Sequence, residues 1–556
     1  MPAGLSAKTA DSNKVLGFKT LLMRMGRRGS GKTEIWQRGT IPPMLSEPIR
    51  ELLAKVQDAE DVHRSAPQGE MLEFSTIVGK AASLYEKLRY LIDYREEHTI
   101  RRAALERILK RRVFIEQKAE SGIVLLQELV DGKYIPKELA TEEIAREIDN
   151  IIFKYLELSR RGRANGSVGR RLISFAATEI DAHISPVEYA IDHESTEALY
   201  RSLKGRASAY GYSEEEINAQ LYCACWRGLL GADDERLAYA LWLLYVPAWN
   251  KDVDLEEVVG KLPTVIGNIR AAVADSLQWR IAPKIKNESI YFRIIRKVLE
   301  SQRGAAGRIL ENPGELDQFT RDFLEETYEH ENERIQKSGI RAVLYLFITK
   351  MTIAVVAELP YELFVLGGIN YLPLSVNILF HPLLLFALTR RAGSLDEANT
   401  TAIIEGLHGI LYEGKGRSIR LQGGYSGLTF AFSIAYLFLF IIVFGGVIGV
   451  LQILAFNPVS IGLFLFFLAL VSYFAFRIRY RARRWKLVRE QGTISIILGV
   501  LAVPIVRAGE WLSRTFSSIN VFVLILDFII ETPFKRLLHF ANQFLIYLRE
   551  KGEEIR

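Results

Sequence analysis

Two long apolar runs in the C-terminal part restrict most strongly what this chain can fold into. They read LTFAFSIAYLFLFIIVFGGVIGVLQILAF and VSIGLFLFFLALVSYFAF, and only Asn457 and Pro458 stand between them. A helix needs about 20 mostly apolar residues to cross a bilayer, and it satisfies its own backbone hydrogen bonds there. The two runs therefore predict a transmembrane helical hairpin at 428–476.

Two further apolar pairs flank this hairpin. AVLYLFITKMTIAVVAELPYELFVL and INYLPLSVNILFHPLLLFAL, joined by Gly367 and Gly368, predict a first transmembrane hairpin at 341–391. TISIILGVLAVPIV and NVFVLILDFII form a third pair at 493–534, around the polar link RAGEWLSRTFSSI. These segments are short, so the third pair spans the membrane, re-enters it or lies in its interface. The sequence thus predicts about four to six spans in hairpins.

Basic residues at the ends of the hairpins indicate the side of the membrane on which each loop lies. Lys and Arg in short loops stay on the cytoplasmic side. Such residues are Arg334, Lys337, Arg341, Arg390, Arg391, Lys415, Arg417, Arg420, Arg477, Arg479, Arg481, Arg483, Arg484 and Lys486. We therefore expect a multi-pass protein of the cell inner membrane with both termini cytoplasmic. A 392–427 loop with an amphipathic helix, a basic 477–492 loop and an amphipathic 535–556 tail would meet anionic lipid there.

The chain before Ile340 has a different character. The whole sequence combines 49% hydrophobic with 24% charged residues, a mixture that suggests two unlike parts. From 45 to 340 the pattern is helical, and Ile77, Leu84 and Leu91 recur at heptad spacing, as in a helical hairpin or short coiled coil. The predicted fold class is therefore all-α: a cytoplasmic helical domain at 45–340, followed by a polytopic α-helical membrane domain.

Local signals mark where helices of the cytoplasmic domain begin and end. Ser185 precedes Glu188, and Ser213 precedes Glu216, with the spacing of a capping box. Gly231 predicts a helix end, because glycine tolerates the left-handed conformation that closes many helices.

The stretch GRRGSGKT matches the phosphate-binding pattern G-x-x-x-x-G-K-[ST]. Its fixed positions are Gly26, Gly31, Lys32 and Thr33. That motif needs a buried strand before it and a long helix after it, whose N-terminus faces the phosphates. Here no such strand precedes it, and Gly39 and Pro42 leave barely two helical turns. We therefore interpret 1–44 as a basic, flexible arm or a targeting segment, and we expect no nucleotide, no cofactor and no enzymatic activity.

Two charged groups in the helical domain could be taken for binding sites. A basic group is interpreted as a solvated face or one turned to anionic lipid. It comprises Arg101, Arg102, Arg107, Lys110, Arg111 and Arg112. A second group matches no metal-ligand spacing, so no metal site is expected. It comprises Glu179, Asp181, His183, Asp192, His193, Glu194 and Glu197.

Three further observations exclude other functions. The net charge of +6 is concentrated in the basic N-terminal arm, so nucleic-acid binding is not expected. The aromatic stretch from Tyr239 to Trp249 is interpreted as helical core rather than a cofactor platform. Cys223 and Cys225, two apart on a helix, point in different directions and are interpreted as buried thiols that do not pair.

Ionisable residues inside the apolar segments are few, and each is unfavourable there unless it is paired or faces water. They are Lys350, Glu358, Glu362, His381, Asp527 and Glu531. Lys350 and Glu358 are about two helical turns apart, and Glu362 follows about one turn later. The three residues therefore share one face of the first span. These six residues form a candidate ion pathway.

Two repeated patterns in the membrane half have simpler explanations than a ligand site. Glu358 and Glu531 each begin a Glu-x-Pro-aromatic sequence, which fits an inverted repeat with broken helices but more readily a coincidence near the interfaces. Gly445 and Gly449 have GxxxG spacing, which predicts close helix packing.

Two functions of different class remain open from the sequence. The first is a membrane-anchored interaction or scaffold protein, whose helical domain binds an unidentified protein partner or a second copy. The second is a cation or proton transporter or channel that uses the intramembrane carboxylates. Because no transport motif is visible, the sequence slightly favours the first. Convergence of the acidic residues on one shared site would favour the second.

Overall fold

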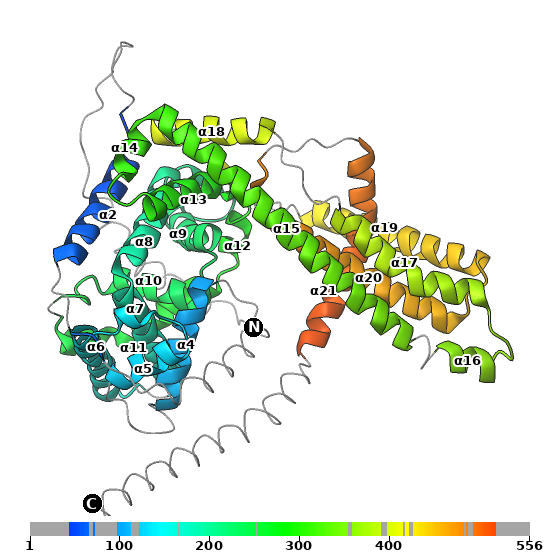
Figure 1. Ribbon diagram of the computed structural model, residues 1–556, viewed down its shortest axis with the longest axis horizontal. Coiled ribbons are helices and arrows are strands. Elements are labelled where there is room, and N and C mark those ends of the chain that lie inside the picture. The colour runs from blue at the N-terminus through cyan, green and yellow to red at the C-terminus, as the bar shows by residue number, and fades with distance from the viewer. Residues whose placement is uncertain are drawn as a thin grey trace, which may run out of the picture. The chain divides into compact units, whose positions relative to one another are not determined.

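The computed structural model describes residues 44–65, 70–72, 97–112, 122–164, 166–251, 253–353, 358–390, 397–414, 418–421, 426–482, 485–487 and 493–518. These residues are almost entirely helical, which confirms the predicted all-α class (Figure 1). The chain divides into two compact units. Met1–Leu324 with Glu397–Gly423 is called the helical unit, and Glu325–Asp396 with Gly424–Arg556 is called the membrane unit.

The helical unit contains most of the helices. They are α2 (Glu47–Ser65), α4 (Glu97–Arg111), α5 (Gly122–Asp131), η2 (Lys137–Leu139), α6 (Glu142–Arg161), α7 (Ser167–Ile184), α8 (Pro186–Leu203), α9 (Glu214–Leu230), α10 (Asp234–Tyr245), α11 (Leu255–Ala274), α12 (Leu277–Ile281), α13 (Lys286–Ser301), α14 (Ala306–Glu311), the start of α15 (Pro313–Ile353) and α18 (Glu397–Leu411). Consecutive helices pack in pairs, as α5 does on α6, α6 on α7 and α8 on α9, while α2 lies along α8 and α4 along α7 (Figure 1).

One of the two expected capping boxes forms. Ser213 accepts a hydrogen bond from the Glu216 backbone, and the Glu216 carboxylate accepts one from the Ser213 backbone, so α9 begins with a complete capping box. The same helix ends at Gly231, whose φ of 65° is left-handed, as expected. Ser185 makes no side-chain cap bond at α8, and Glu188 is instead in an ion pair with an arginine that follows α13. Proline at the start of α8 fixes the backbone there without a serine cap.

Aromatic side chains from α10 and the turn after it fill the core of the helical unit. Tyr239, Trp242 and Trp249 are fully buried, and the ring centroids of the two tryptophans lie 5.1 Å apart. The interpretation of this stretch as helical core is confirmed. Cys223 and Cys225 on α9 are both buried and unpaired with each other, also as expected.

The segment that was expected as a 392–427 loop contributes α18 and β2 (Ile419–Leu421) to the helical unit. Strand β2 pairs in parallel with β1 (Ala207–Ala209). His408 of α18 lies 2.7 Å from Asp317 at the start of α15, and the Tyr412 hydroxyl donates to a backbone carbonyl of α14 at 2.9 Å. The chain thus leaves the helical unit along α15 and returns to complete its core.

The membrane unit is formed by the remainder of α15, α16 (Leu359–Phe364), α17 (Tyr371–Arg390), α19 (Ser426–Ile453), α20 (Pro458–Ala482) and α21 (Thr493–Ser518). Helix α20 packs on both α17 and α21, and α19 also packs on α21. Four helices in the described part of the chain are long and apolar enough to cross a bilayer. The candidate spans are Tyr371–Leu388, Phe430–Ile453, Pro458–Ile478 and Ile496–Thr515.

One detail of the membrane half differs from the sequence prediction. The polar link at 507–518 is helical and continues α21 to Ser518; its one glycine, Gly509, disfavours a helix by only about 1 kcal/mol. The expected first span is described in two parts, α15 to Ile353 and α16 from Leu359 with Glu358 as its N-cap, and residues 354–357 between them lie outside the described residues. The apolar segment NVFVLILDFII and the 535–556 tail lie outside the described residues, as do the 1–43 arm and the heptad stretch at 73–96.

The membrane unit exposes large apolar side chains and buries ionisable ones beside its apolar clusters. On α15, Leu344 and Ile348 are exposed, whereas Lys350 is buried. On α17, Leu383 is exposed, whereas His381 is buried. Large exposed apolar side chains on polar-centred helices are expected where lipid replaces water as solvent. Together with the four candidate spans, this arrangement identifies the chain as a membrane protein.

Candidate functional site

A chain of buried polar side chains links four elements of the membrane unit. The Lys350 ammonium on α15 donates to Asn377 Oδ1 on α17 at 2.6 Å. Asn377 Nδ2 in turn donates to Glu358 Oε1 at the start of α16, and the Ser460 hydroxyl of α20 also hydrogen-bonds to Glu358. Each of these four side chains is at most 3% exposed. The structure therefore brings Lys350 and Glu358 together through an amide bridge.

The orientation of the Asn377 amide follows from the chemistry of its partners. An ammonium only donates hydrogen bonds and an ionised carboxylate only accepts them, whereas an amide does both. Asn377 therefore presents its oxygen to Lys350 and its nitrogen to Glu358. The Lys350 ammonium also lies 4.1 Å from the centroid of the Phe467 ring, a cation–π distance.

Glu362 forms a second arm of this polar chain, one helical turn from Glu358. Its carboxylate accepts from the Asn370 backbone N–H at 3.0 Å and from Asn457 Nδ2 at 3.2 Å. Asn370 directly precedes α17, and Asn457 directly precedes α20. Glu362 therefore connects α16 to the starts of α17 and α20. The end of the unit at which the turns before these two helices lie is called the turn side.

His381 lies at the other end of the chain. Its Nε2 is 3.0 Å from the carbonyl oxygen of Phe464, and its Nδ1 is 3.3 Å from the carbonyl oxygen of Asn377. Both carbonyl oxygens can only accept, so the ring nitrogen that carries the proton donates to its carbonyl, and the shorter distance is the one to Phe464. The imidazole is fully buried one turn beyond Asn377 on α17.

The polar chain enters the unit from one side and stops at an apolar layer. From Asn457 to Phe464 along α20 it extends about 10 Å, at 1.5 Å per residue. Leu385 and Phe467 lie about one helical turn beyond His381 and Phe464, and Val471 and Ala475 follow on later turns of α20; all four are buried. The buried polar side chains, called the polar path, therefore lie between the starts of α17 and α20 and this apolar cluster.

Sequence reasoning found the charged members of this site and missed the neutral ones. Lys350, Glu358, Glu362 and His381 all line the path, whereas Asp527 and Glu531 lie outside the described residues. Asn377 and Ser460 escaped notice because single amides and hydroxyls are common in apolar helices, where they usually bond to their own backbone. The signal that could have found Asn377 is its position one turn before His381 on the same helix face.

The two glycines with GxxxG spacing make no close contact with other described residues. A Cβ atom built at Gly445 or Gly449 would meet nothing within 4 Å. Close packing of α19 through these glycines is therefore not seen among the described residues.

The acidic and histidine-rich group of the helical unit is dispersed over separate ion pairs. Glu179 bonds with Lys154, and Asp192 with Arg236. Four further members pair outside the group: Asp181 with Arg101, His183 with Glu147, Glu194 with Lys55, and Glu197 with Arg201. His193 lies 3.1 Å from Glu194 of the same group. Within the described residues, no group of three or more His, Cys, Asp or Glu side chains could hold a metal ion.

The basic group on α4 is paired inside the helical unit, so the solvated face expected there is wrong. Arg102 is buried and pairs with Glu106 and with Asp233. Arg111 and Arg112 pair with Glu128 of α5. These arginines fasten α4 to its neighbours, because a buried guanidinium requires nearby carboxylates.

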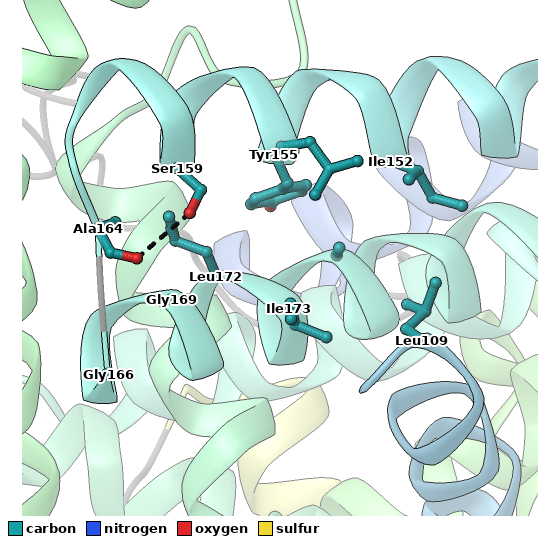
Figure 2. Close-up of a pocket in the computed structure, with 11 residues that line it drawn as sticks. Leu109, Ile152, Tyr155, Ser159, Ala164, Gly166, Gly169, Leu172 and Ile173 are labelled. Carbon is teal, nitrogen blue, oxygen red and sulfur yellow. Dashed lines mark hydrogen bonds between the residues drawn. The ribbon is translucent and has the colours of Figure 1, made fainter. Parts of the chain in front are cut away.

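The helical unit also contains a cavity of about 190 Å³ between α6 and α7 (Figure 2). Its walls are mostly apolar, with Ile152 on α6, Leu172 and Ile173 on α7, and Leu109 of α4 at one end. The polar groups nearest to it are already bonded, since the Ser159 hydroxyl donates to the Ala164 carbonyl at 3.4 Å. The cavity therefore offers space without reactive or charged groups.

Comparisons with known proteins add no family assignment: no family model, no curated protein and no solved structure matches this chain.

Proposed function

We propose that this membrane protein moves a proton or a small cation through its membrane unit, with Glu358 as the exchanging carboxylate. The observation that supports this function is the group of buried polar side chains, Glu362, Glu358, Asn377, Lys350 and His381, within a unit whose outer surface is apolar. Ionisable groups in such surroundings are unfavourable, and those that are retained most often mark an ion or proton pathway. Enzymatic activity is not part of this proposal.

Glu358 is the central member of this pathway for a geometric reason. It lies between the Glu362 arm on the turn side and the amide-bridged Lys350 on the inner side. Its hydrogen-bond partners Asn377 and Ser460 come from two different helices, α17 and α20. A shift of α16 against those helices would change the bonding of this carboxylate directly, which is what an exchanging group requires.

We further propose that the protein lies in the cell inner membrane with the helical unit and both termini in the cytoplasm. The basic residues around the apolar helices support this orientation, because Lys and Arg remain on the cytoplasmic side. The turns before α17 and α20 would then face outward, and the polar path would open to the outer side. Anionic lipid is the expected partner of the basic loops.

The direct test is proton flux into liposomes that contain the purified full-length protein and an internal pH-sensitive dye. With the membrane potential set by K⁺ and valinomycin, we expect the wild-type protein to carry flux. Glu358→Gln should reduce the flux about tenfold or more, because a neutral amide cannot exchange a charge. Glu510→Gln is the matched control, since Glu510 is a carboxylate of the same unit that pairs with Arg514 of its own helix.

A wild-type protein that carries no proton, Na⁺, K⁺ or Mg²⁺ flux would contradict this proposal. A membrane-anchored interaction protein would then be the better explanation. One observation favours that second function: the helical unit has its own buried core and is completed by α18 after the chain returns from the membrane unit. An unidentified protein or a second copy would be its partner.

A further inference from the structure

The ionisable groups of the membrane site are unequal in charge. Two buried carboxylates, Glu358 and Glu362, stand against one buried ammonium, Lys350. A neutral imidazole with one protonated nitrogen adds no charge, and His381 is counted here in that form. Among the described residues, the site with Glu358, Glu362 and Lys350 ionised therefore has an excess of one negative charge, which a single proton or monovalent cation neutralises.

Lys350 is held less completely than a buried ammonium requires. An ammonium has three N–H donors, and among the described residues its one hydrogen-bond acceptor is Asn377 Oδ1. The face of Phe467 covers another side of it. Asn377 also lies between the Lys350 ammonium and the Glu358 carboxylate. Lys350 thus supplies one fixed positive charge within the site. The Glu358 carboxylate remains available to a second positive charge, which can exchange.

We propose that Lys350 sets the charge of the transported species: the site accepts one monovalent hard cation, Na⁺ or K⁺, or one proton in its place, and excludes divalent ions. This inference rests on the proposed function and names its substrate class. The oxygen atoms at hand are the carboxylates of Glu358 and Glu362 and the Ser460 hydroxyl, and hard cations prefer such ligands. A divalent ion beside Lys350 would leave the buried site with a net positive charge, which a lipid-embedded interior disfavours.

Two substitutions at Lys350 separate charge from shape. Lys350→Met removes the charge and keeps a long apolar stem, so the site is left with two uncompensated carboxylates. We expect this variant to admit Mg²⁺ or Ca²⁺, seen as millimolar divalent ions slowing Na⁺ flux at least about tenfold more than in the wild type. Lys350→Arg keeps the positive charge and should retain the wild-type preference for monovalent ions.

The experiment measures ²²Na⁺ uptake into proteoliposomes of the full-length protein, with and without Mg²⁺ or Ca²⁺. Wild-type uptake that divalent ions leave unchanged, together with divalent block in Lys350→Met and none in Lys350→Arg, supports the inference. Wild-type protein that carries Mg²⁺ as readily as Na⁺ overturns it, even if no Lys350 variant folds. Unchanged selectivity in a folded Lys350→Met variant overturns it as well. In both of these outcomes the wild-type protein still carries ions, so the proposed function is not contradicted. Absence of any wild-type flux contradicts the proposed function.

Discussion

The two units of this chain treat buried charge in opposite ways. In the helical unit, the Glu179 carboxylate accepts from Lys154 Nζ at 2.8 Å, from the Tyr155 hydroxyl at 2.7 Å and from Trp249 Nε1 at 2.7 Å. In the membrane unit, the Lys350 ammonium has one oxygen acceptor among the described residues, supplied by a neutral amide. One site is saturated with partners and the other is not.

This difference contrasts a structural role with the transporting role proposed above. A buried charge whose hydrogen bonds are all made is fixed in place, and removing one partner is strongly destabilising. A buried charge with few partners is itself unfavourable, because the low dielectric of the interior leaves it uncompensated. We therefore expect Glu179 to stabilise the fold, whereas the exchange proposed for Glu358 would take place beside the less completely bonded Lys350.

The largest expected effect is at the saturated site. Glu179→Ala removes the acceptor of three donors and leaves Lys154 beside Trp249 without its carboxylate. We expect the helical unit to lose about 3–5 kcal/mol in its free energy of unfolding. Denaturant unfolding of the purified protein measures this loss. Glu256→Ala is the control, since this exposed glutamate pairs with Arg161 on the surface and should change stability by less than about 1 kcal/mol.

A smaller effect is expected where helices of the membrane unit approach most closely. A Cβ atom at Gly509 of α21 would collide with the backbone carbonyl of Ala469 on α20. Gly509→Ala should therefore destabilise the membrane unit by about 1–3 kcal/mol, measured by thermal unfolding in detergent. Gly499→Ala lies on the same helix with open space around its Cβ, and it should be neutral or slightly stabilising. Equal losses for the two variants would show that α21 does not pack on α20 in this register.

A still smaller effect on stability is expected at the unsaturated site. Glu358→Gln keeps the shape of the side chain and removes a charge whose described partners are an amide and a hydroxyl. We expect a change of less than about 1 kcal/mol in either direction, because the lost hydrogen-bond strength is offset by relief of desolvation. A loss of several kcal/mol, similar to Glu179→Ala, would instead make Glu358 a structural residue and remove the contrast between the units.

How far the sequence predicted this structure depends on whether a feature is local or arises from long-range contacts. The apolar helices α19 and α20 and the cap of α9 by Ser213 are set by composition and short spacing, and these predictions agree with the structure. The pairing of Arg102 with Asp233 joins positions far apart in the chain, so the segment looked like a solvated basic face. Asn377 was missed for the same reason, because its two partners lie on different elements.

The return of α18 to the helical unit also could not be read from one sequence. Its apolar positions fit a lipid-facing amphipathic helix as well as a helix that packs on protein. The position of α18 is determined by contacts with distant segments. One of them is the 2.6 Å hydrogen bond from the Ser46 backbone N–H to the Leu411 carbonyl. Hydrophobic periodicity reports that one face is buried, and it does not report against what.

The chain's two cysteines make it possible to test the comparison in one unit at a time. Both Cys223 and Cys225 lie on α9 in the helical unit, and the chain has two cysteines in all. Burial raises the pKa of the Cys223 thiol to about 12, so at pH 8 it is protonated as well as inaccessible. Because the thiolate is the reactive form, we expect no reaction with Ellman's reagent in the native protein and reaction of two thiols after denaturation.

The sign of this pKa shift also predicts that the helical unit loses stability at alkaline pH. A thiol whose pKa is raised in the folded state, from 9.0 to about 12, contributes stability that is fully present below pH 9 and is lost as pH rises towards 12. Thiol reaction should therefore speed up above pH 9 through opening of the helical unit. At pH 8, Glu179→Ala should speed it up and Glu358→Gln should leave it unchanged, since only the first substitution weakens the unit that contains both thiols. Equal acceleration by both variants would mean that the two units unfold together, and that saturated and unsaturated buried charges contribute to one shared stability.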